Sequence, residues 1–221
     1  MNDAFPRCAV PGSSCRLLQL ESPGARPVWA VLDAAGTQLK IVANVGVGFN
    51  NIDLAACSAR GVVATNTPDV LTDATADTAL ALVLEVTRRF GEGQRIIRDQ
   101  RPWVFGLFGM LGVGLAGKRA GIVGPGSIGI ATARRLRALG MEIAYAGRSP
   151  MRPAAAEELG AERVELDELL ATSDVISLHV PYTSQTHHLI GAAQLAAMKP
   201  TAFLINTARG AVVDEAALVE A

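Results

Sequence analysis

The chain has 221 residues, of which 50% are hydrophobic and only 5% aromatic, and its formal net charge is −1. This composition favours an α/β core over an all-β sandwich, and the lack of any block of like charge argues against nucleic acid as a partner. The most apolar run, Ala79–Val86, is too short to span a membrane. The N-terminus has no secretory signal pattern, and Cys8, Cys15 and Cys57 form neither a disulfide framework nor a metal cluster. We therefore expect a reduced, cytoplasmic protein that holds no metal.

The first hundred residues predict a small β-turn-α-β unit followed by one long helix. The predicted elements are a short strand at Arg16–Leu20, a strand at Leu39–Val45, a helix at Asp53–Arg60 and a strand at Val62–Asn66. Leu80, Val83 and Leu84 then recur at helical spacing, and arginines gather toward the later turns. This pattern predicts a single helix over Thr72–Arg98.

Strands and helices alternate after a glycine-rich link at Gln100–Gly117. Strands are predicted at Lys118–Val123, Glu142–Ala146, Arg163–Glu165, Val175–His179 and Ala202–Asn206. Helices are predicted at Ser127–Leu139, Pro153–Leu159, Asp167–Ala171, Ala192–Ala197 and from Asp214 to the end. Such alternation predicts a doubly wound parallel sheet of the Rossmann type.

A glycine motif stands between the first of these strands and its helix. Gly124, Gly126 and Gly129 have the G-x-G-x-x-G spacing, in the strand-to-helix context that dinucleotide binding requires. Gly124 suits a tight turn, Gly126 a close approach of a pyrophosphate, and Gly129 close packing of helix on strand. The N–H groups at the start of the helix would face the phosphates. The alternative is a glycine-rich turn that binds nothing.

The residues after the second strand of this unit indicate which dinucleotide is bound. An acidic residue there would bind the adenosine ribose and select NAD, whereas an arginine accommodates a 2′-phosphate. The chain has Ala146-Gly147-Arg148-Ser149-Pro150 at this point. Arg148 and Ser149 therefore favour NADP, with NAD possible, and the alternative is a solvated loop arginine.

Two further strand ends carry reactive side chains. His179-Val180-Pro181 ends one strand, and Asn206-Thr207-Ala208-Arg209-Gly210 ends the next. Arg209 is a candidate to bind a substrate carboxylate, while His179 is more often structural at such a position. The remaining polar residues have structural explanations: His187 and His188 lie in a loop without metal-type spacing, Asp174 precedes a strand, and Asp214 suits a helix N-cap.

Several long motifs in the same order resemble the D-isomer-specific 2-hydroxyacid dehydrogenases, and among them the glyoxylate/hydroxypyruvate reductase branch. The matching stretches are Val45–Gly48, Asn66–Asp77, Gly121–Gly129, Ser173–Pro181, Met198–Pro200 and Asn206–Asp214. The resemblance implies an oxidoreductase that reduces a small 2-keto acid by hydride transfer from a nicotinamide. It also implies a homodimer in the full-length parent, formed through the cofactor domain.

The resemblance also implies residue roles. Arg209 would be the catalytic arginine that binds the substrate, and the backbone amides of Val47 and Gly48 would bind the substrate carboxylate. The cofactor contacts would come from Thr72, Gly124, Gly126, Ser127, Ile128, Gly129, Arg148, Ser149, Pro181, Thr207 and Ala208. In the family a histidine held by a glutamate donates the proton; both follow the arginine, and only twelve residues follow Arg209 here.

We therefore expect an incomplete Rossmann-type domain at 101–221, joined to a partial, flavodoxin-like substrate domain with its linking helix at 1–100. We also expect that this chain alone does not reduce keto acids, with His179 as the one substitute proton donor in place. Two other readings stay open: a non-catalytic NAD(H)-binding sensor or corepressor-like member of the fold, and an inactive fragment. The identity of the keto acid is not decided by the sequence.

Overall fold

A computed structural model describes residues 28–102, 106 and 109–221 of the chain. The strand predicted at Arg16–Leu20, and the cysteines Cys8 and Cys15, lie outside the described residues. The chain divides between Leu71 and Thr72 into two compact units.

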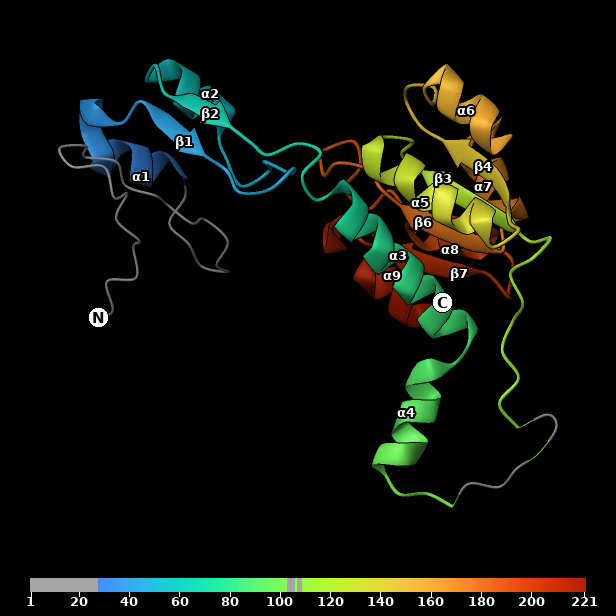
Figure 1. Ribbon diagram of the computed structural model, residues 1–221. Coiled ribbons are helices and arrows are strands. Elements are labelled where there is room, and N and C mark those ends of the chain that lie inside the picture. Colours follow the sequence, from blue (N-terminus) through green and yellow to red (C-terminus); the bar gives the residue numbers. More distant parts are fainter. Residues whose placement is uncertain (1–27, 103–105, 107–108) are drawn as a thin grey trace. The chain divides into compact units, whose positions relative to one another are not determined.

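The first unit contains two short parallel strands covered by helices (Figure 1). Its elements are α1 (Val28–Ala35), a 3-10 turn (Gly36–Gln38), β1 (Ile41–Ala43), α2 (Leu54–Ala59) and β2 (Val63–Thr65), with β1 paired to β2. Its small core joins Leu32, Val42, Ile52, Cys57 and Val62. The Asp53 carboxylate accepts a hydrogen bond from the Ala56 N–H at 2.8 Å and so starts α2. The predicted β-turn-α-β unit is confirmed with shorter strands.

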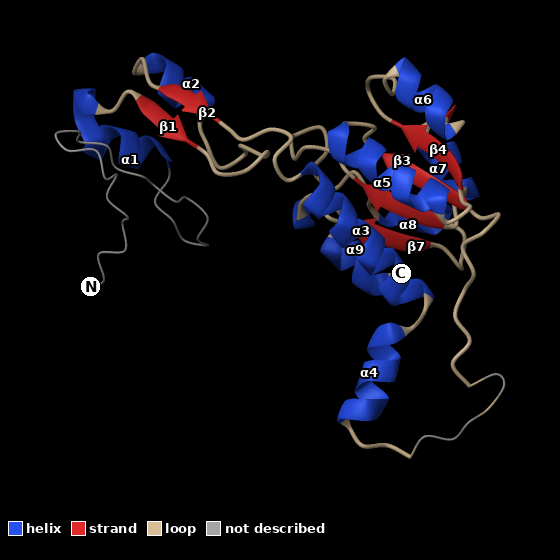
Figure 2. Cartoon of the chain, viewed as in Figure 1, coloured by secondary structure: helices blue, strands red, loops and turns tan. Residues whose placement is uncertain are grey.

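The second unit is a five-stranded parallel sheet with helices on both faces (Figure 2). Its strands are β3 (Arg119–Val123), β4 (Glu142–Ala146), β5 (Glu162–Arg163), β6 (Val175–Leu178) and β7 (Phe203–Asn206), in the spatial order β5-β4-β3-β6-β7. Its helices are α3 (Thr72–Thr87), α4 (Phe90–Arg98), α5 (Ser127–Ala138), α6 (Pro153–Leu159), α7 (Leu166–Thr172), α8 (Ala192–Ala197) and α9 (Glu215–Glu220). The order reverses at β3, which is the doubly wound Rossmann arrangement that the sequence predicts.

Side chains alternate along the strands between two cores. Ile122, Ile143 and Val175 point to the face covered by α3, α5 and α6. Val123 and Ile176 point to the face covered by α7 and α8. Because both faces are covered, the strands read as nearly continuous apolar runs, as expected for parallel sheets.

The prediction of a single helix over Thr72–Arg98 is wrong. The chain forms α3 and α4, and Arg89 between them takes the left-handed conformation with φ 59°. The carbonyl of Thr87 accepts a hydrogen bond from the Val113 N–H at 2.7 Å, so it is not used to continue the helix. This contact comes from a segment far along the chain, which is why helical periodicity could not predict the break.

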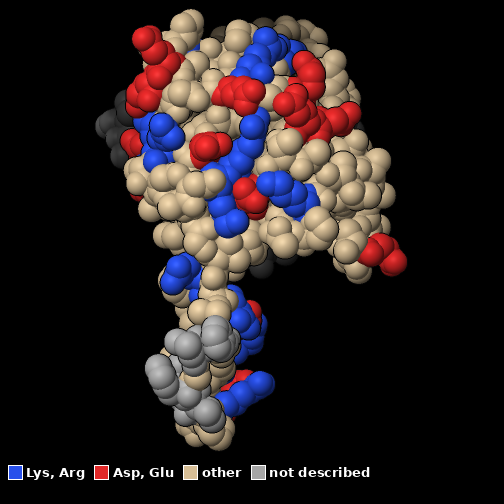
Figure 3. Space-filling model, turned by 90° about the vertical axis from the view of Figure 1, so that its right-hand side faces the viewer, with Lys and Arg blue, Asp and Glu red and all other residues tan. Residues whose placement is uncertain are grey.

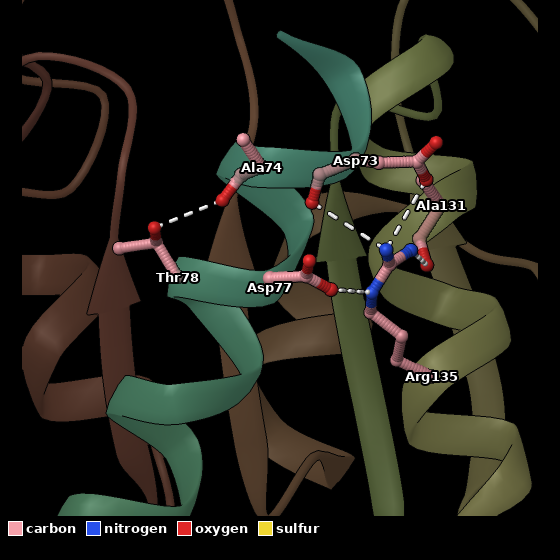
Figure 4. A network of polar contacts seen from close by, with 6 residues as sticks. All are labelled: Asp73, Ala74, Asp77, Thr78, Ala131 and Arg135. Carbon is pink, nitrogen blue, oxygen red and sulfur yellow. Dashed lines mark hydrogen bonds and ion pairs between the residues drawn. The ribbon is translucent and has the colours of Figure 1, made fainter.

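Helix α3 is fastened to α5 by one arginine (Figure 4). Arg135 donates from Nε to Asp77 at 2.7 Å and from Nη2 to the Asp73 carboxylate at 3.1 Å. A third nitrogen donates to the Ala131 carbonyl within α5. Val83 of α3 is fully buried in the same core as α5, so α3 packs as part of the second unit.

Candidate functional site at the carboxyl edge of the sheet

Four loops meet at one edge of the five-stranded sheet. They follow β3, β4, β6 and β7, and because these strands are parallel their carboxyl ends lie at the same edge. Backbone hydrogen bonds tie two of the loops to the ends of neighbouring strands: the Gly124 N–H donates to Ala146 O of β4 at 2.9 Å, and the His179 N–H donates to Val123 O of β3 at 2.7 Å. Ligands of open α/β sheets bind at this edge, next to the strand where the order reverses.

The glycine loop after β3 has the geometry that its spacing predicts. Gly124 has φ +96°, and a Cβ there would lie 2.7 Å from the His179 carbonyl oxygen. A Cβ on Gly129 would overlap the Gly124 carbonyl oxygen, so the helix can approach the strand this closely only without a side chain. The fold therefore requires glycine at both positions, whether or not a ligand binds.

Gly126 differs from its two neighbours. A Cβ built on it meets no atom within 4 Å, although this residue is the N-cap of α5. Ser127 and Ile128 follow as the first residues of this twelve-residue helix, and Ser127 is exposed. An open glycine before a helix N-terminus leaves room for a phosphate against backbone N–H groups. These residues fit the pyrophosphate of a dinucleotide.

The loop after β4 lies against the glycine loop. A Cβ on Gly147 would lie 2.5 Å from Pro125 Cδ, so the two loops are in contact. Arg148 and Ser149 are both exposed, and Arg148 makes no hydrogen bond or ion pair within the described part of the chain. Gly147 lies outside the glycine motif, yet the close approach of Pro125 leaves no room for a side chain on it either.

The loop after β6 begins with the half-buried imidazole of His179. His179 Nε2 lies 2.9 Å from Ser177 Oγ, and burial lowers the pKa of His179 to about 4. The ring is therefore uncharged at neutral pH, which favours a structural role. Pro181 is exposed, and its carbonyl accepts a hydrogen bond from Thr186 Oγ1 at 2.6 Å.

The loop after β7 is held by the side chain of Asn206. Its Nδ2 donates to the Arg209 carbonyl at 2.8 Å, and its Oδ1 accepts from the Ala208 N–H at 2.9 Å. The Thr207 hydroxyl inside this loop is buried without a hydrogen-bond partner, while the Arg209 side chain is exposed and bonds the Ala208 carbonyl. A buried polar atom without a partner is not specific to this edge, because among the described residues Ser173 Oγ and Arg119 Nε at the amino edge also have none. The sequence did not predict this role of Asn206, because its contacts depend on the conformation of the loop.

The loop that contains Val47 and Gly48 lies in the first unit and follows β1. Asn44 Nδ2 donates to the carbonyls of Gly46 and Gly48 at 3.1 and 2.9 Å, and Asn66 Nδ2 donates to the Val47 carbonyl at 3.0 Å. Three successive carbonyls are thus satisfied by side chains. A turn whose carbonyls are occupied in this way can present its amides to an anion.

The other predicted positions have structural contacts. Thr72 is half-buried as the first residue of α3. The His187 ring contacts Tyr182, and His188 Nδ1 lies 3.7 Å from Asp214 Oδ2. Asp214 caps α9 as predicted.

Among the residues that the structure describes, no group of three or more His, Cys, Asp or Glu side chains could hold a metal ion. Within the same ranges, no helix is both long and apolar enough to cross a membrane.

Asp174 belongs to the opposite, amino edge of the sheet. Its Oδ2 accepts from the Arg119 N–H at 2.9 Å, and its Oδ1 lies 3.1 Å from Lys199 Nζ. Partial burial acts to raise the pKa of Asp174, but the Arg119 hydrogen bond and the Lys199 ammonium outweigh it, so this pKa lies below its usual value. These contacts give Asp174 a structural role.

Comparison with known proteins agrees with this geometry. Residues 80–221 match the family model of the D-isomer specific 2-hydroxyacid dehydrogenase NAD binding domain. A glyoxylate reductase of Thermococcus litoralis is 51% identical over 189 residues, which are 83% of this chain and 56% of that protein. The chain thus spans little more than half the length of such relatives.

Two solved structures extend the comparison to the fold. The TT0316 protein of Thermus thermophilus superposes with a TM-score of 0.82 at 44% identity, over 89% of this chain and 61% of that one. A D-lactate dehydrogenase of Aquifex aeolicus, solved with NAD and lactic acid, has a TM-score of 0.76 at 35% identity, over 83% and 54%. With its reversed strand order and its glycine loop at the carboxyl edge, the chain belongs to the D-isomer specific 2-hydroxyacid dehydrogenase family.

Proposed function

We propose that the protein acts as an NADP(H)-linked oxidoreductase that reduces a small 2-keto acid such as glyoxylate or hydroxypyruvate. One observation carries the proposal: two loops lie at the same edge of the sheet. One is the glycine loop, which is open at Gly126, and the other exposes Arg209. The first suits a dinucleotide pyrophosphate and the second suits a carboxylate. In this proposal residues 101–221 form the cofactor domain, and residues 1–100 contribute part of the substrate domain and the linking helical segment, of which α3 packs on the cofactor domain.

The preference for NADP rests on the loop after β4. Arg148 and Ser149 are exposed where an NAD-selective site would have a carboxylate. Arg148 has no partner among the described residues, so its guanidinium is available to a 2′-phosphate. Ser149 would add a hydroxyl donor. The other proposed cofactor contacts are Thr72, Gly124, Gly126, Ser127, Ile128, Gly129, Pro181, Thr207 and Ala208.

We assign substrate binding to one set of groups in each unit. Each set is held in place by contacts within its own unit. In the second unit Asn206 fixes the backbone of Arg209, whose planar fork can bind a carboxylate with two hydrogen bonds. In the first unit the amides of Val47 and Gly48 are proposed to bind a substrate carboxylate, because the carbonyls of their loop are satisfied by Asn44 and Asn66.

Reduction of a keto acid needs a hydride at the carbonyl carbon and a proton at its oxygen. A nicotinamide bound at the glycine loop would supply the hydride, and the carbonyl oxygen, which gains the electron pair of the C=O π bond, would take the proton. Arg209 would polarise that carbonyl and stabilise the developing charge. His179 is a poor donor because its ring is uncharged at neutral pH, so we assign no proton donor among the described residues.

The test measures binding and turnover separately. NADPH and NADH are titrated against the protein by nucleotide fluorescence, in the wild type and in Arg148→Ala. We expect NADPH to bind at least tenfold more tightly, and the substitution to remove most of that difference, since a charge-assisted hydrogen bond contributes about 1.5–3 kcal/mol. Equal affinities in the wild type would contradict the NADP assignment.

Turnover with glyoxylate and hydroxypyruvate is measured on the 221-residue chain and, where the coding sequence extends further, on the longer product. We expect little or no turnover from the 221-residue chain. In the active form, Arg209→Lys should lower turnover by roughly tenfold or more, because lysine keeps the charge but loses the fork. Cofactor binding without turnover in every form would instead support a nicotinamide-binding sensor. Self-association as a dimer remains a prediction of the resemblance.

A further inference from the structure

A second arginine reaches the loop after β4 from a neighbouring strand. Arg163 lies on β5, where its backbone pairs with Tyr145 of β4, two residues before Gly147. Its Nη2 donates to the Gly147 carbonyl at 3.3 Å. The guanidinium is therefore held at the residue that directly precedes Arg148, although Arg163 lies 15 positions after Arg148 in the sequence.

Most of the hydrogen-bonding capacity of Arg163 is unused. A guanidinium has five N–H donors, and a single bond at 3.3 Å occupies only one of them weakly. Arg163 is exposed and forms no ion pair within the described ranges. The carboxylate of its neighbour Glu162 is bound instead by Arg119, at 2.8 Å. None of the described residues forms an ion pair that neutralises the charge of Arg163.

The positive charge here is local. Residues 147–152 contain Arg148 and Arg152 and no acidic residue. On the molecular face shown in Figure 3, by contrast, Lys and Arg lie interspersed with Asp and Glu. The net charge of the whole chain is −1, so a general positive field cannot draw a phosphate to this loop. Attraction has to come from the arginines beside it.

We propose that Arg163 is a specificity-determining residue, which together with Arg148 binds the 2′-phosphate of NADP(H). The proposal rests on the NADP preference inferred above and adds a residue that the glycine motif and its flanking loop do not include. A phosphate monoester carries close to two negative charges and three acceptor oxygens, so it can take hydrogen bonds from two guanidinium groups at once. The bond to the Gly147 carbonyl would keep Arg163 in position before the nucleotide arrives.

The experiment compares two probes that differ only in the 2′-phosphate, namely 2′,5′-ADP and 5′-AMP. Their dissociation constants are measured by calorimetry on the full 221-residue chain. In Arg163→Met, which keeps most of the apolar stem, we expect the dissociation constant for 2′,5′-ADP to rise about tenfold and that for 5′-AMP to change less than about twofold. Arg163→Lys should give an intermediate loss, because it keeps the charge and not the fork.

Arg137→Met is the matched control. Arg137 Nη1 also donates to a backbone carbonyl at long distance, that of Met141 at 3.4 Å, but at the amino edge of the sheet. This variant removes the same charge, and the selectivity for 2′,5′-ADP should not change. Circular dichroism and thermal unfolding identify any variant that has lost its fold.

The outcomes separate this proposal from the one it rests on. If the wild type binds the two probes equally, the NADP preference itself fails. If the wild type discriminates and Arg148→Ala removes the discrimination while Arg163→Met does not, only the role of Arg163 is overturned. Equal weakening of both probes in Arg163→Met would also overturn it, because the residue would then support only the shape of the loop.

Discussion

The two edges of the five-stranded sheet differ in how charged side chains next to them are paired. At the amino edge, Asp174 is bound by the Arg119 N–H and by Lys199. At the carboxyl edge, the exposed Arg148 has no hydrogen-bond or ion-pair partner among the described residues, and Gly126 faces open space before the N-terminus of α5. An unpaired guanidinium and an open helix N-terminus can both bind an anionic ligand, whereas the paired Asp174 serves the fold. This difference supports our proposal that the ligand site lies at the carboxyl edge.

The glycine loop offers the largest test of this comparison, because its glycines serve different purposes. Gly129→Ala should lower the free energy of unfolding by about 3 kcal/mol, since its Cβ would overlap the Gly124 carbonyl and backbone cannot easily move away. Gly126→Ala should cost less than about 1 kcal/mol of stability but weaken NADPH binding at least tenfold. Urea unfolding and fluorescence titration of both variants provide the measurements. Similar stability losses in the two variants would erase the distinction between a structural and a ligand-facing glycine.

Asp174 tests the amino edge. Asp174→Ala leaves the Arg119 N–H and two nearby lysines without their acceptor, so we expect a loss of about 2 kcal/mol in the free energy of unfolding. NADPH affinity should stay within about twofold of the wild type. Asp99→Ala, which removes an exposed partner of Arg101, is the control and should change stability by less than about 0.5 kcal/mol. A loss of cofactor affinity in folded Asp174→Ala would contradict the assignment of this edge to structure alone.

The smallest effect that we predict is on the pH dependence of the free energy of unfolding. It differs between His179 at the carboxyl edge and Asp174 at the amino edge. The pKa of His179 is about 4 in the folded state against about 6.5 when unfolded, so the unfolded chain binds the proton first as pH falls. Its contribution is complete above pH 6.5 and is lost between about pH 6.5 and 4, amounting to at most about 2 kcal/mol between pH 7 and 5. The lowered pKa of Asp174 acts only in more acidic solution, below its usual pKa of 3.8.

Urea unfolding at pH 7 and pH 5 measures the His179 contribution. His179→Gln should lose less stability over this interval than the wild type, because glutamine does not titrate. An equal loss of stability in both proteins would mean that the pKa of His179 is not lowered in the folded state. In Asp174→Asn, measured in parallel, the free energy of unfolding should change between pH 7 and pH 5 by the same amount as in the wild type.

Local patterns were enough to predict most elements of the second unit. Strand β4 and helices α6 and α8 have the predicted bounds, because each is a short apolar or alanine-rich run enclosed by glycine or proline. Three glycines at fixed spacing predicted a strand-turn-helix loop, since the geometry depends on which side chains are absent. In the first unit α1 was missed, because proline and glycine upstream obscure its start.

Contacts between distant segments were decided only by the tertiary structure. Thr87 ends α3 because Val113 takes its carbonyl, and Arg163 reaches Gly147 because β5 pairs with β4. Asn206 gains a role only when its loop folds back on it. The sequence by itself determined the elements, the order in which they alternate and the glycine turn, because these depend on neighbours within a few residues. Which polar groups are paired and which are not depended on contacts between segments up to tens of residues apart, and only the packed sheet brought those segments together.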